Sequence, residues 1–251
     1  IWGYVVDGYF KTDEEARNYK VDQSFVNQMI NASALDNGLH AGDLKFVDLD
    51  GNNKIEQTTS ANDRKDMKVI GNSLPRYNYN FGISADWYGI DFSVLFQGIG
   101  KQNWYPGAET SMFWGPYSRP YASFIPSDFM SQVWSEENTD AYFPRPRGYV
   151  ALGSNRELAV VNTKYLQNLA YCRLKNLSIG YTLPDKWLSK IGFEKIRVYF
   201  SGENLLTFTK LHSDYIDPEQ ASASNSWKTS KSDANIYPWA KTYSFGVDIT
   251  F

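Results

Sequence analysis

Cysteine and histidine are almost absent from this sequence of 251 residues, which contains one cysteine, Cys172, and two histidines, His40 and His212. One cysteine excludes an intramolecular disulfide framework and any zinc site built from several cysteines. The two histidines stand far apart in segments that read as loops, so we expect surface residues rather than ligands. Cys172 lies in a predicted strand and is expected to be a small buried side chain.

Enzyme motifs are also missing. The chain has no Gly-x-Ser-x-Gly, no P-loop and no His-Glu-x-x-His, and Gly98-Ile-Gly100 lacks the third glycine of a dinucleotide fingerprint because Asn103 stands in its place. The sequence therefore predicts a protein that is not an enzyme and has no catalytic residues. The net charge of −3 and a pI of about 5.5 give no indication of nucleic-acid binding.

Long hydrophobic runs are lacking as well. No run approaches the roughly 18 apolar residues of a membrane helix, and the mean hydropathy of −0.48 is typical of a soluble protein. Transmembrane strands escape this test because they alternate apolar and polar residues, which averages their hydropathy. The first residues, 1–4, are neither basic nor followed by an apolar stretch, so we expect no signal peptide and a chain that begins inside a larger protein.

What the sequence has in abundance is aromatic residues, 16% of the total, and strict alternation. Residues 243–251 place five apolar side chains on one face and none on the other, which predicts a strand. The same period of two recurs over 77–87, 90–97, 176–183 and 196–203. Each run is close to the length, about 9–11 residues, that crosses a bilayer when tilted. Residues 172–175 fall out of phase, which predicts a bulge or the membrane rim.

The connections between these strands alternate in length. Short connections are predicted at 88–89 and 184–194, and long ones at about 101–164 and 210–238. Outer-membrane barrels have short periplasmic turns and long extracellular loops. The fold class predicted is therefore all-β, an antiparallel transmembrane barrel, of which five strands can be only a part. A soluble sandwich shows the same alternation and remains the alternative.

Several segments, in order along nearly the whole chain, resemble the C-terminal part of the SusC/RagA family of TonB-linked outer-membrane transporters. They include GYVVDGYFKTDEE at 3–15, GDLKFVDLDGNNKI at 42–55 and RLKNLSIGYTLP at 173–184, with further matches at 63–64, 70–72, 75–98, 204–206 and Phe251. The resemblance implies the C-terminal strands of a barrel of about 22 strands, with the N-terminal plug and its TonB box outside this sequence. Residues 1–76 would form an extracellular loop region with a short helix and an Asp/Asn-rich turn, and 77–251 the barrel strands and their loops.

The function implied by the resemblance is nutrient import across the bacterial outer membrane. The expected cargo is an oligosaccharide, or in some members a peptide, and the expected partners are a SusD-like lipoprotein, the TonB complex through the missing N-terminal region, and outer-membrane lipid. Nucleic acid is not an expected partner. Two other functions remain open: a soluble all-β carbohydrate-binding module and an outer-membrane barrel enzyme.

A calcium site is one hypothesis for the Asp-rich turn. The side chains of Asp48, Asp50 and Asn52 and the carbonyl of Lys54 have the spacing of the first half of an EF-hand loop. Position 6 is Asn53 rather than glycine and position 12 is Thr59 rather than glutamate, so Asp63 would have to complete the site. The alternative is a structural Asx-rich turn without metal, and no cofactor is required.

Aromatic side chains in the 101–164 segment are candidate ligand contacts, because flat rings can stack on sugars. The candidates are Trp104, Tyr105, Trp114, Tyr117 and Tyr121. The alternative is that they anchor a long loop or meet the lipoprotein. Two further expectations are structural: Thr12 and Glu15 predict a helix capping box, and Asp86, Asp91, Arg197, Glu203 and Asp248 are predicted to face the barrel lumen and form cross-strand pairs.

Overall fold

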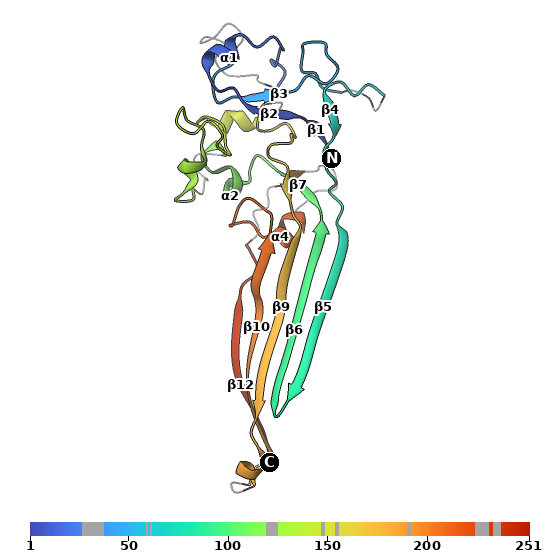
Figure 1. Ribbon diagram of the computed structural model, residues 1–251, viewed down its shortest axis with the longest axis vertical. Coiled ribbons are helices and arrows are strands. Elements are labelled where there is room, and N and C mark those ends of the chain that lie inside the picture. Colours follow the sequence, from blue (N-terminus) through green and yellow to red (C-terminus); the bar gives the residue numbers. More distant parts are fainter. Residues whose placement is uncertain are drawn as a thin grey trace.

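A long antiparallel sheet and a head built from the segments between its strands make up the molecule (Figure 1). The computed structural model describes residues 1–26, 38–58, 60, 62–118, 125–146, 149–153, 156–189, 192–223, 231–232 and 237–251. Among these residues, no helix has the length and apolar character needed to span a membrane.

The long sheet has five strands in the order β12-β10-β9-β6-β5, and every neighbouring pair is antiparallel. Its strands are β5 (Arg76–Trp87), β6 (Ile90–Lys101), β9 (Tyr171–Thr182), β10 (Lys195–Thr209) and β12 (Thr242–Thr250). All five strands predicted from alternation are present, and β6 and β10 extend further than their alternating runs. The prediction of an all-β antiparallel fold is confirmed.

Short connections join the strands at the end of the sheet away from the head (Figure 1). β5 and β6 are linked by Tyr88 and Gly89 alone, whose φ angles of 47° and 84° are both positive. Two successive residues with positive φ form the turn that matches the twist of a hairpin. β9 and β10 are joined through the short helix α3 (Asp185–Leu188).

The predicted bulge lies on β9 at Lys175. Leu95 and Phe96 are consecutive on β6, yet they pair with Asn176 and Leu174, so Lys175 is the extra residue. The phase slip in the sequence is this bulge. The register with β10 is interrupted at the same height, between Glu203 and Leu206.

The head gathers segments that are far apart in the sequence around a main hydrophobic core, beside which Phe10, Ala16 and Leu39 form a second small cluster. Its short strands are β1 (Trp2–Tyr4), β2 (Val6–Tyr9), β3 (Leu44–Phe46), β4 (Met67–Val69), β7 (Asn103–Pro106), β8 (Gln167–Asn168) and β11 (Lys231–Ser232). Its helices are α1 (Asp13–Arg17), α2 (Ser111–Trp114), α4 (Pro218–Ala223) and the 3-10 turns η1 (Gly115–Tyr117), η2 (Phe129–Gln132) and η3 (Tyr149–Leu152). The core joins buried residues of 4–55, 104–169 and 211–221. The division of the chain at residue 76 remains a prediction.

Helix α1 begins as the capping residues predict. The Thr12 side chain accepts a hydrogen bond from the Glu15 N–H at 3.1 Å. The Glu15 carboxylate accepts from the N–H of Lys11 at 2.8 Å, one residue earlier than in a standard capping box. This exchange fixes the chain direction into α1.

Candidate functional site

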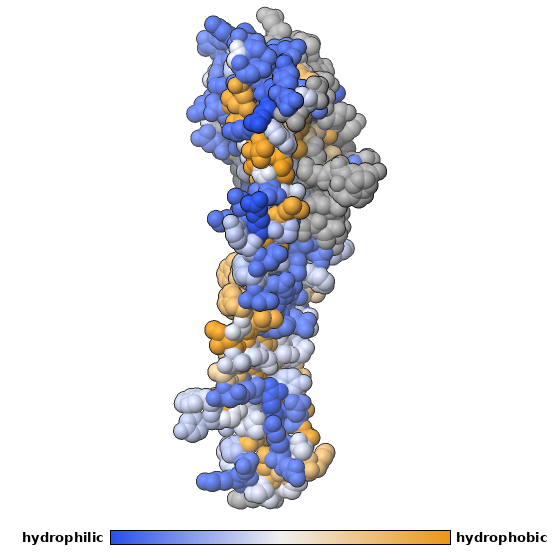
Figure 2. Space-filling view, turned by 90° about the vertical axis from the view of Figure 1, so that its right-hand side faces the viewer, coloured by the Kyte–Doolittle hydropathy of each residue, from blue (hydrophilic) through white to orange (hydrophobic). Residues whose placement is uncertain are grey.

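One face of the five-stranded sheet is apolar from edge to edge and exposed. At successive heights, the paired residues form rows that cross all five strands. Two of these rows are Ala85, Phe92, Ile179, Phe200, Phe245 and Trp87, Ile90, Tyr181, Val198, Val247. Phe245 is 83% exposed and Val247 56%. Figure 2 shows hydrophobic side chains at the surface in the half of the molecule that contains the long strands.

The opposite face of the sheet is polar. Its middle row consists of five serines, one from each strand: Ser84, Ser93, Ser178, Ser201 and Ser244. The sheet is therefore two-faced, with apolar rows on one side and mainly hydroxyl, amide and charged side chains, interrupted by Leu95, on the other. Monomeric soluble proteins rarely expose a continuous apolar surface of this extent.

Towards the short turns, the polar face contains an ionic cluster. Arg197 binds Asp91 through two hydrogen bonds, Nε to Oδ1 at 2.8 Å and Nη2 to Oδ2 at 2.6 Å, and donates from Nη1 to Asp248 at 3.2 Å. The predicted cross-strand pairs are thus confirmed for these three residues, which come from β6, β10 and β12.

Near the head, a second ionic cluster holds helix α4 against the polar face. The Arg173 side chain, 3% exposed, donates to Asp217 Oδ2 at 2.7 Å, to Glu219 Oε2 at 2.8 Å and to Thr207 at 2.9 Å. Lys175, the bulge residue, also contacts Glu219 at 2.8 Å. The segment after β10 therefore folds back over the wall of the sheet, at the end opposite to the short turns.

The aromatic candidates for ligand binding lie inside the head. Trp104, Tyr105 and Trp114 are 0% exposed and Tyr117 is 2% exposed, and Tyr121 lies outside the described residues. The hydroxyls of Tyr105 and Tyr117 donate to the carbonyls of Leu158 and Pro144, and the Trp114 indole donates to Gly107. This is the placement expected of packing anchors, which was the alternative derived from the sequence.

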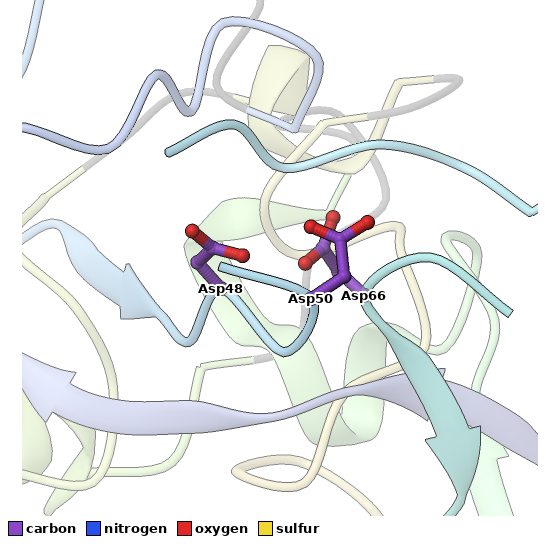
Figure 3. Close-up of side chains that lie close together, drawn as sticks. All are labelled: Asp48, Asp50 and Asp66. Atoms are coloured by element: carbon purple, nitrogen blue, oxygen red, sulfur yellow. The ribbon is translucent and has the colours of Figure 1, made fainter. Parts of the chain in front are cut away.

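The Asp-rich turn brings three carboxylates together (Figure 3). Asp48 and Asp50 on the turn and Asp66, which precedes β4, have carboxylate oxygens within 4.8 Å of one another. Asp66 takes the position for which the sequence suggested Asp63, whose carboxylate is 3.6 Å from the Lys65 ammonium. The predicted ligand Asn52 uses its side-chain oxygen to accept from the N–H of Lys54 at 2.8 Å.

The surroundings shift the pKa values of two of these carboxylates, Asp66 and Asp48, in opposite directions. Burial raises the pKa of Asp66, and the negative charges of Asp50 and Asp48 raise it further, against hydrogen bonds from the N–H groups of Glu56 and Leu49. Desolvation has the same upward effect on Asp48, but the N–H groups of Asn53 and Gly51 overcome it and lower the pKa of Asp48. A divalent cation would relieve the repulsion that acts on Asp66.

The chain is similar in sequence to curated TonB-dependent receptors of one bacterium. No family model matches the chain. Over 212 residues, or 82% of the chain, it is 31% identical to TonB-dependent receptor P3 of Formosa agariphila. It is also 26% identical over 227 residues to TonB-dependent receptor P26 of the same organism.

The chain belongs to the TonB-dependent receptor family. It spans about a fifth of the length of these curated relatives, 19% of one and 21% of the other. The fold agrees: the structure of the RagAB peptide importer in its 'open-open' state aligns with 100% of this chain and 22% of that chain, with a TM-score of 0.59 and 20% identity. The expected SusC/RagA-type barrel portion is confirmed at the level of the fold.

In the barrel fold of this family, the five strands are one segment of the wall. The two edges of that segment are β5 and β12. The features that sequence reasoning missed all depend on contacts between distant segments. They are the row of serines, the pairing of Arg173 with Asp217 and Glu219, and the contribution of Asp66 to the carboxylate cluster. Only the spacing of acidic residues after the Asp-rich turn could have suggested Asp66.

Proposed function

We propose that this chain is part of the wall and the extracellular loops of an outer-membrane importer that works through TonB. The whole receptor would take up an organic nutrient, an oligosaccharide in the first place or else a peptide, together with a SusD-like surface lipoprotein. This segment contributes no catalytic step. The observation that carries the proposal is the continuous, exposed apolar face of a sheet whose other face is polar.

The apolar face has the right chemistry for lipid. In a closed barrel every backbone group pairs within the wall, the outer side chains meet hydrocarbon and the inner ones line the lumen. Isolated in water, rows such as Phe92, Ile179 and Phe245 would cost roughly 25 cal/mol for each Å² of apolar surface left exposed. A lipid environment removes that cost.

The ends of the strands support a membrane position. Tyr77 and Trp87 lie near the two ends of β5 and are 72% and 70% exposed. Ten residue steps of about 3.3 Å separate them, and a tilt of about 40° reduces this length to roughly the 25 Å height of the apolar band of such barrels. Tyrosine and tryptophan are preferred at the two membrane interfaces.

The polar face and the head support a transport role. The head joins the ends of the strands that lie opposite the short turns, the position of extracellular loops in outer-membrane barrels. Helix α4 is bound to the polar face at the same end. Loops that share one core form a continuous outer surface, which suits contact with a surface lipoprotein and with cargo.

The test is fractionation of cells that express the full-length parent gene with an affinity tag. The receptor should appear in the outer-membrane fraction, should require detergent for extraction and should co-purify with a lipoprotein. Growth on single oligosaccharides or peptides, compared with a strain lacking the gene and with one lacking TonB, would then identify the cargo. Recovery as a soluble monomer would overturn the proposal and favour a carbohydrate-binding module.

A further inference from the structure

The two ends of the long sheet differ in charge. At the end that joins the head (Figure 1), four of the five strands meet a basic residue at their boundary. Arg76 is the first residue of β5 and Lys101 the last residue of β6. Lys210 directly follows β10, and Lys241 directly precedes β12. No acidic residue lies within three positions of any of them in the sequence. We call these four residues the basic rim.

At the opposite end of the sheet, near the short turns, the charges are mixed. Lys195, the first residue of β10, directly follows Glu194. In α3, Lys186 directly follows Asp185. The other strands end there in residues without charge, which are Trp87, Ile90, Thr182 and Thr250. Among the residues that the structure describes, only the strand boundaries at the head therefore carry charges of a single sign.

The positive charges of the basic rim are not neutralised within the part of the chain that the structure describes. All four residues are exposed, and none of them forms a salt bridge with a described residue. By contrast, Arg173 and Lys175 on the same sheet both pair with Glu219. Arg197 pairs with Asp91. The rim therefore differs from the other basic residues of the sheet in having its charge available to a ligand.

Two residues of the basic rim stand directly opposite each other. Arg76 and Lys101 are cross-strand partners in the ladder of β5 and β6, so their Cβ atoms lie about 5 Å apart. Like charges in this arrangement destabilise a sheet. An anion held between the guanidinium and the ammonium group replaces this repulsion by two attractive contacts. The pair therefore indicates an anionic ligand.

Aromatic side chains beside the basic rim indicate where this anion lies. Tyr77 directly follows Arg76 and is 72% exposed, and Tyr243 stands two residues after Lys241 and is 61% exposed. Tyrosine is enriched at the membrane interface, and the long side chains of lysine and arginine extend from there to the charged headgroups. In the proposed barrel, the head lies outside the cell. The rim is then level with the lipid headgroups of the outer leaflet.

Phosphate fits the basic rim, because an arginine guanidinium binds two phosphate oxygens at once and lysines add point charges beside it. We propose that the rim binds the phosphate groups of phosphorylated lipid A, the glycolipid of the outer leaflet. Arg76 and Lys101 hold one phosphate between them, and Lys210 and Lys241 contact headgroups further along the wall. The inference rests on the proposed membrane position of the sheet. It goes beyond the proposed function because it gives the receptor a lipid ligand of defined chemistry, separate from any cargo.

The experiment measures lipid binding by the full-length receptor, purified and washed in detergent, with microscale thermophoresis. The probe is bisphosphorylated lipid A, and the comparison ligand is the same lipid A after removal of its phosphates. The phosphorylated form should bind at least about tenfold more tightly, because the other form offers no anion to the rim. Arg76→Gln, Lys101→Gln, Lys210→Gln and Lys241→Gln should each raise its Kd about fivefold. This ratio corresponds to about 1 kcal/mol for a basic residue at an anionic membrane surface.

Lys186→Gln and Lys195→Gln are the matched controls, because they remove the same charge from exposed residues at the opposite end of the sheet. These variants should bind lipid A as the wild type does. Lys101→Arg and Lys210→Arg keep the charge of the rim and should also leave the Kd unchanged. Inorganic phosphate, added at the same concentration as the lipid, should not displace it, which distinguishes a lipid headgroup from a free phosphate ion.

Three results would overturn the inference: equal binding of the two forms of lipid A, wild-type binding by a variant that lacks all four basic residues, or displacement of the lipid by inorganic phosphate. All three leave recovery of the receptor in the outer membrane and TonB-dependent growth as they are, and these are the tests of the proposed function. Recovery of the receptor as a soluble monomer would instead remove the membrane position on which the rim depends. Failure of the lipid site is therefore distinguishable from failure of the proposed function.

Discussion

Arg197 on β10 reaches across strand β9 to bind Asp91 on β6, with Nη2 2.6 Å from Oδ2. The side chains cross above Gly180, where a β-carbon would lie 2.4 Å from Asp91 Oδ1 and 2.6 Å from Arg197 Nε. The glycine therefore opens the passage for an ion pair between strands that are not neighbours. Two hydrogen bonds thus join β10 to β6 across β9, and a third joins Arg197 to Asp248 on β12.

Gly180→Val should break this pair and destabilise the barrel by about 1–2 kcal/mol, the loss of a charge-assisted hydrogen bond. The measurement is the urea midpoint of the full-length receptor, followed by the heat-modifiable mobility of the folded barrel in gels. Ser178→Val, on the same strand and face, is the control and should have a smaller effect. Once Arg197→Leu has removed the pair, Gly180→Val should add no further loss; a persistent penalty would show that packing, not the pair, is responsible.

Charge on the apolar face should be costly in a depth-dependent way. Val94→Lys, in the middle of β6, should destabilise the barrel by about 2–4 kcal/mol, whereas Val247→Lys, in the row of Trp87 near the short turns, should cost only about 1 kcal/mol. Ser93→Lys faces the polar side and should cost little. The readout is refolding of the receptor in lipid vesicles, and equal costs for Val94→Lys and Ser93→Lys would contradict a lipid-facing surface.

Calcium binding at the Asp-rich turn remains a prediction, and the structure makes it sharper. Added calcium should slow proteolysis of the head, and Asp66→Asn or Asp50→Asn should remove the effect because their carboxylates converge with that of Asp48. At a concentration of about 100 times Kd the ion would stabilise the folded head by about 2.7 kcal/mol. Asp63→Asn is the matched control and should keep the response. A wild-type receptor that responds identically to calcium and EGTA would establish a metal-free Asx turn.

The buried Arg173 cluster should control how firmly α4 is attached. Arg173→Met leaves the carboxylates of Asp217 and Glu219 without their guanidinium and should cost about 3–5 kcal/mol locally. Cleavage of the segment after β10 by added protease on intact cells should become much faster. Adding Asp217→Asn should restore part of the protection, and Arg76→Met, an exposed arginine on β5, should leave the cleavage rate unchanged.

The alternation of the sequence was enough to predict the sheet. Alternation of apolar and polar residues is a local property that can be read from consecutive positions. The break in this alternation at 172–175 also predicted the bulge, which the structure places at Lys175. The register between the strands could not be predicted. Whether Ser84, Ser178 and Ser244 lie in one row depends on the exact length of each turn and on the position of the bulge.

The head was missed for a different physical reason. Its core depends on contacts such as the hydroxyl pair of Tyr9 and Tyr165, 156 residues apart and 2.8 Å from each other. From the sequence, the aromatic rings of the long segments could be either ligand contacts or packing anchors. The structure buries the four that it describes, Trp104, Tyr105, Trp114 and Tyr117, in the interior of the head.

The calcium site at the Asp-rich turn stays a prediction. The structure brings the carboxylate of Asp66, rather than that of Asp63, close to those of Asp48 and Asp50, and a contact between segments this far apart cannot be predicted from spacing alone.

The row of five serines affects how a solute would interact with the polar face of the sheet as it passes through the proposed barrel. On the levels to either side, the polar face bears long or charged groups, Glu203 on one and Asp91 and Tyr199 on the other. At the serine level each side chain is one carbon and one hydroxyl, which can donate or accept a hydrogen bond with equal ease. In the proposed barrel, the part of the wall formed by these five strands is uncharged at this level, and a passing solute can exchange one weak hydrogen bond for another along it.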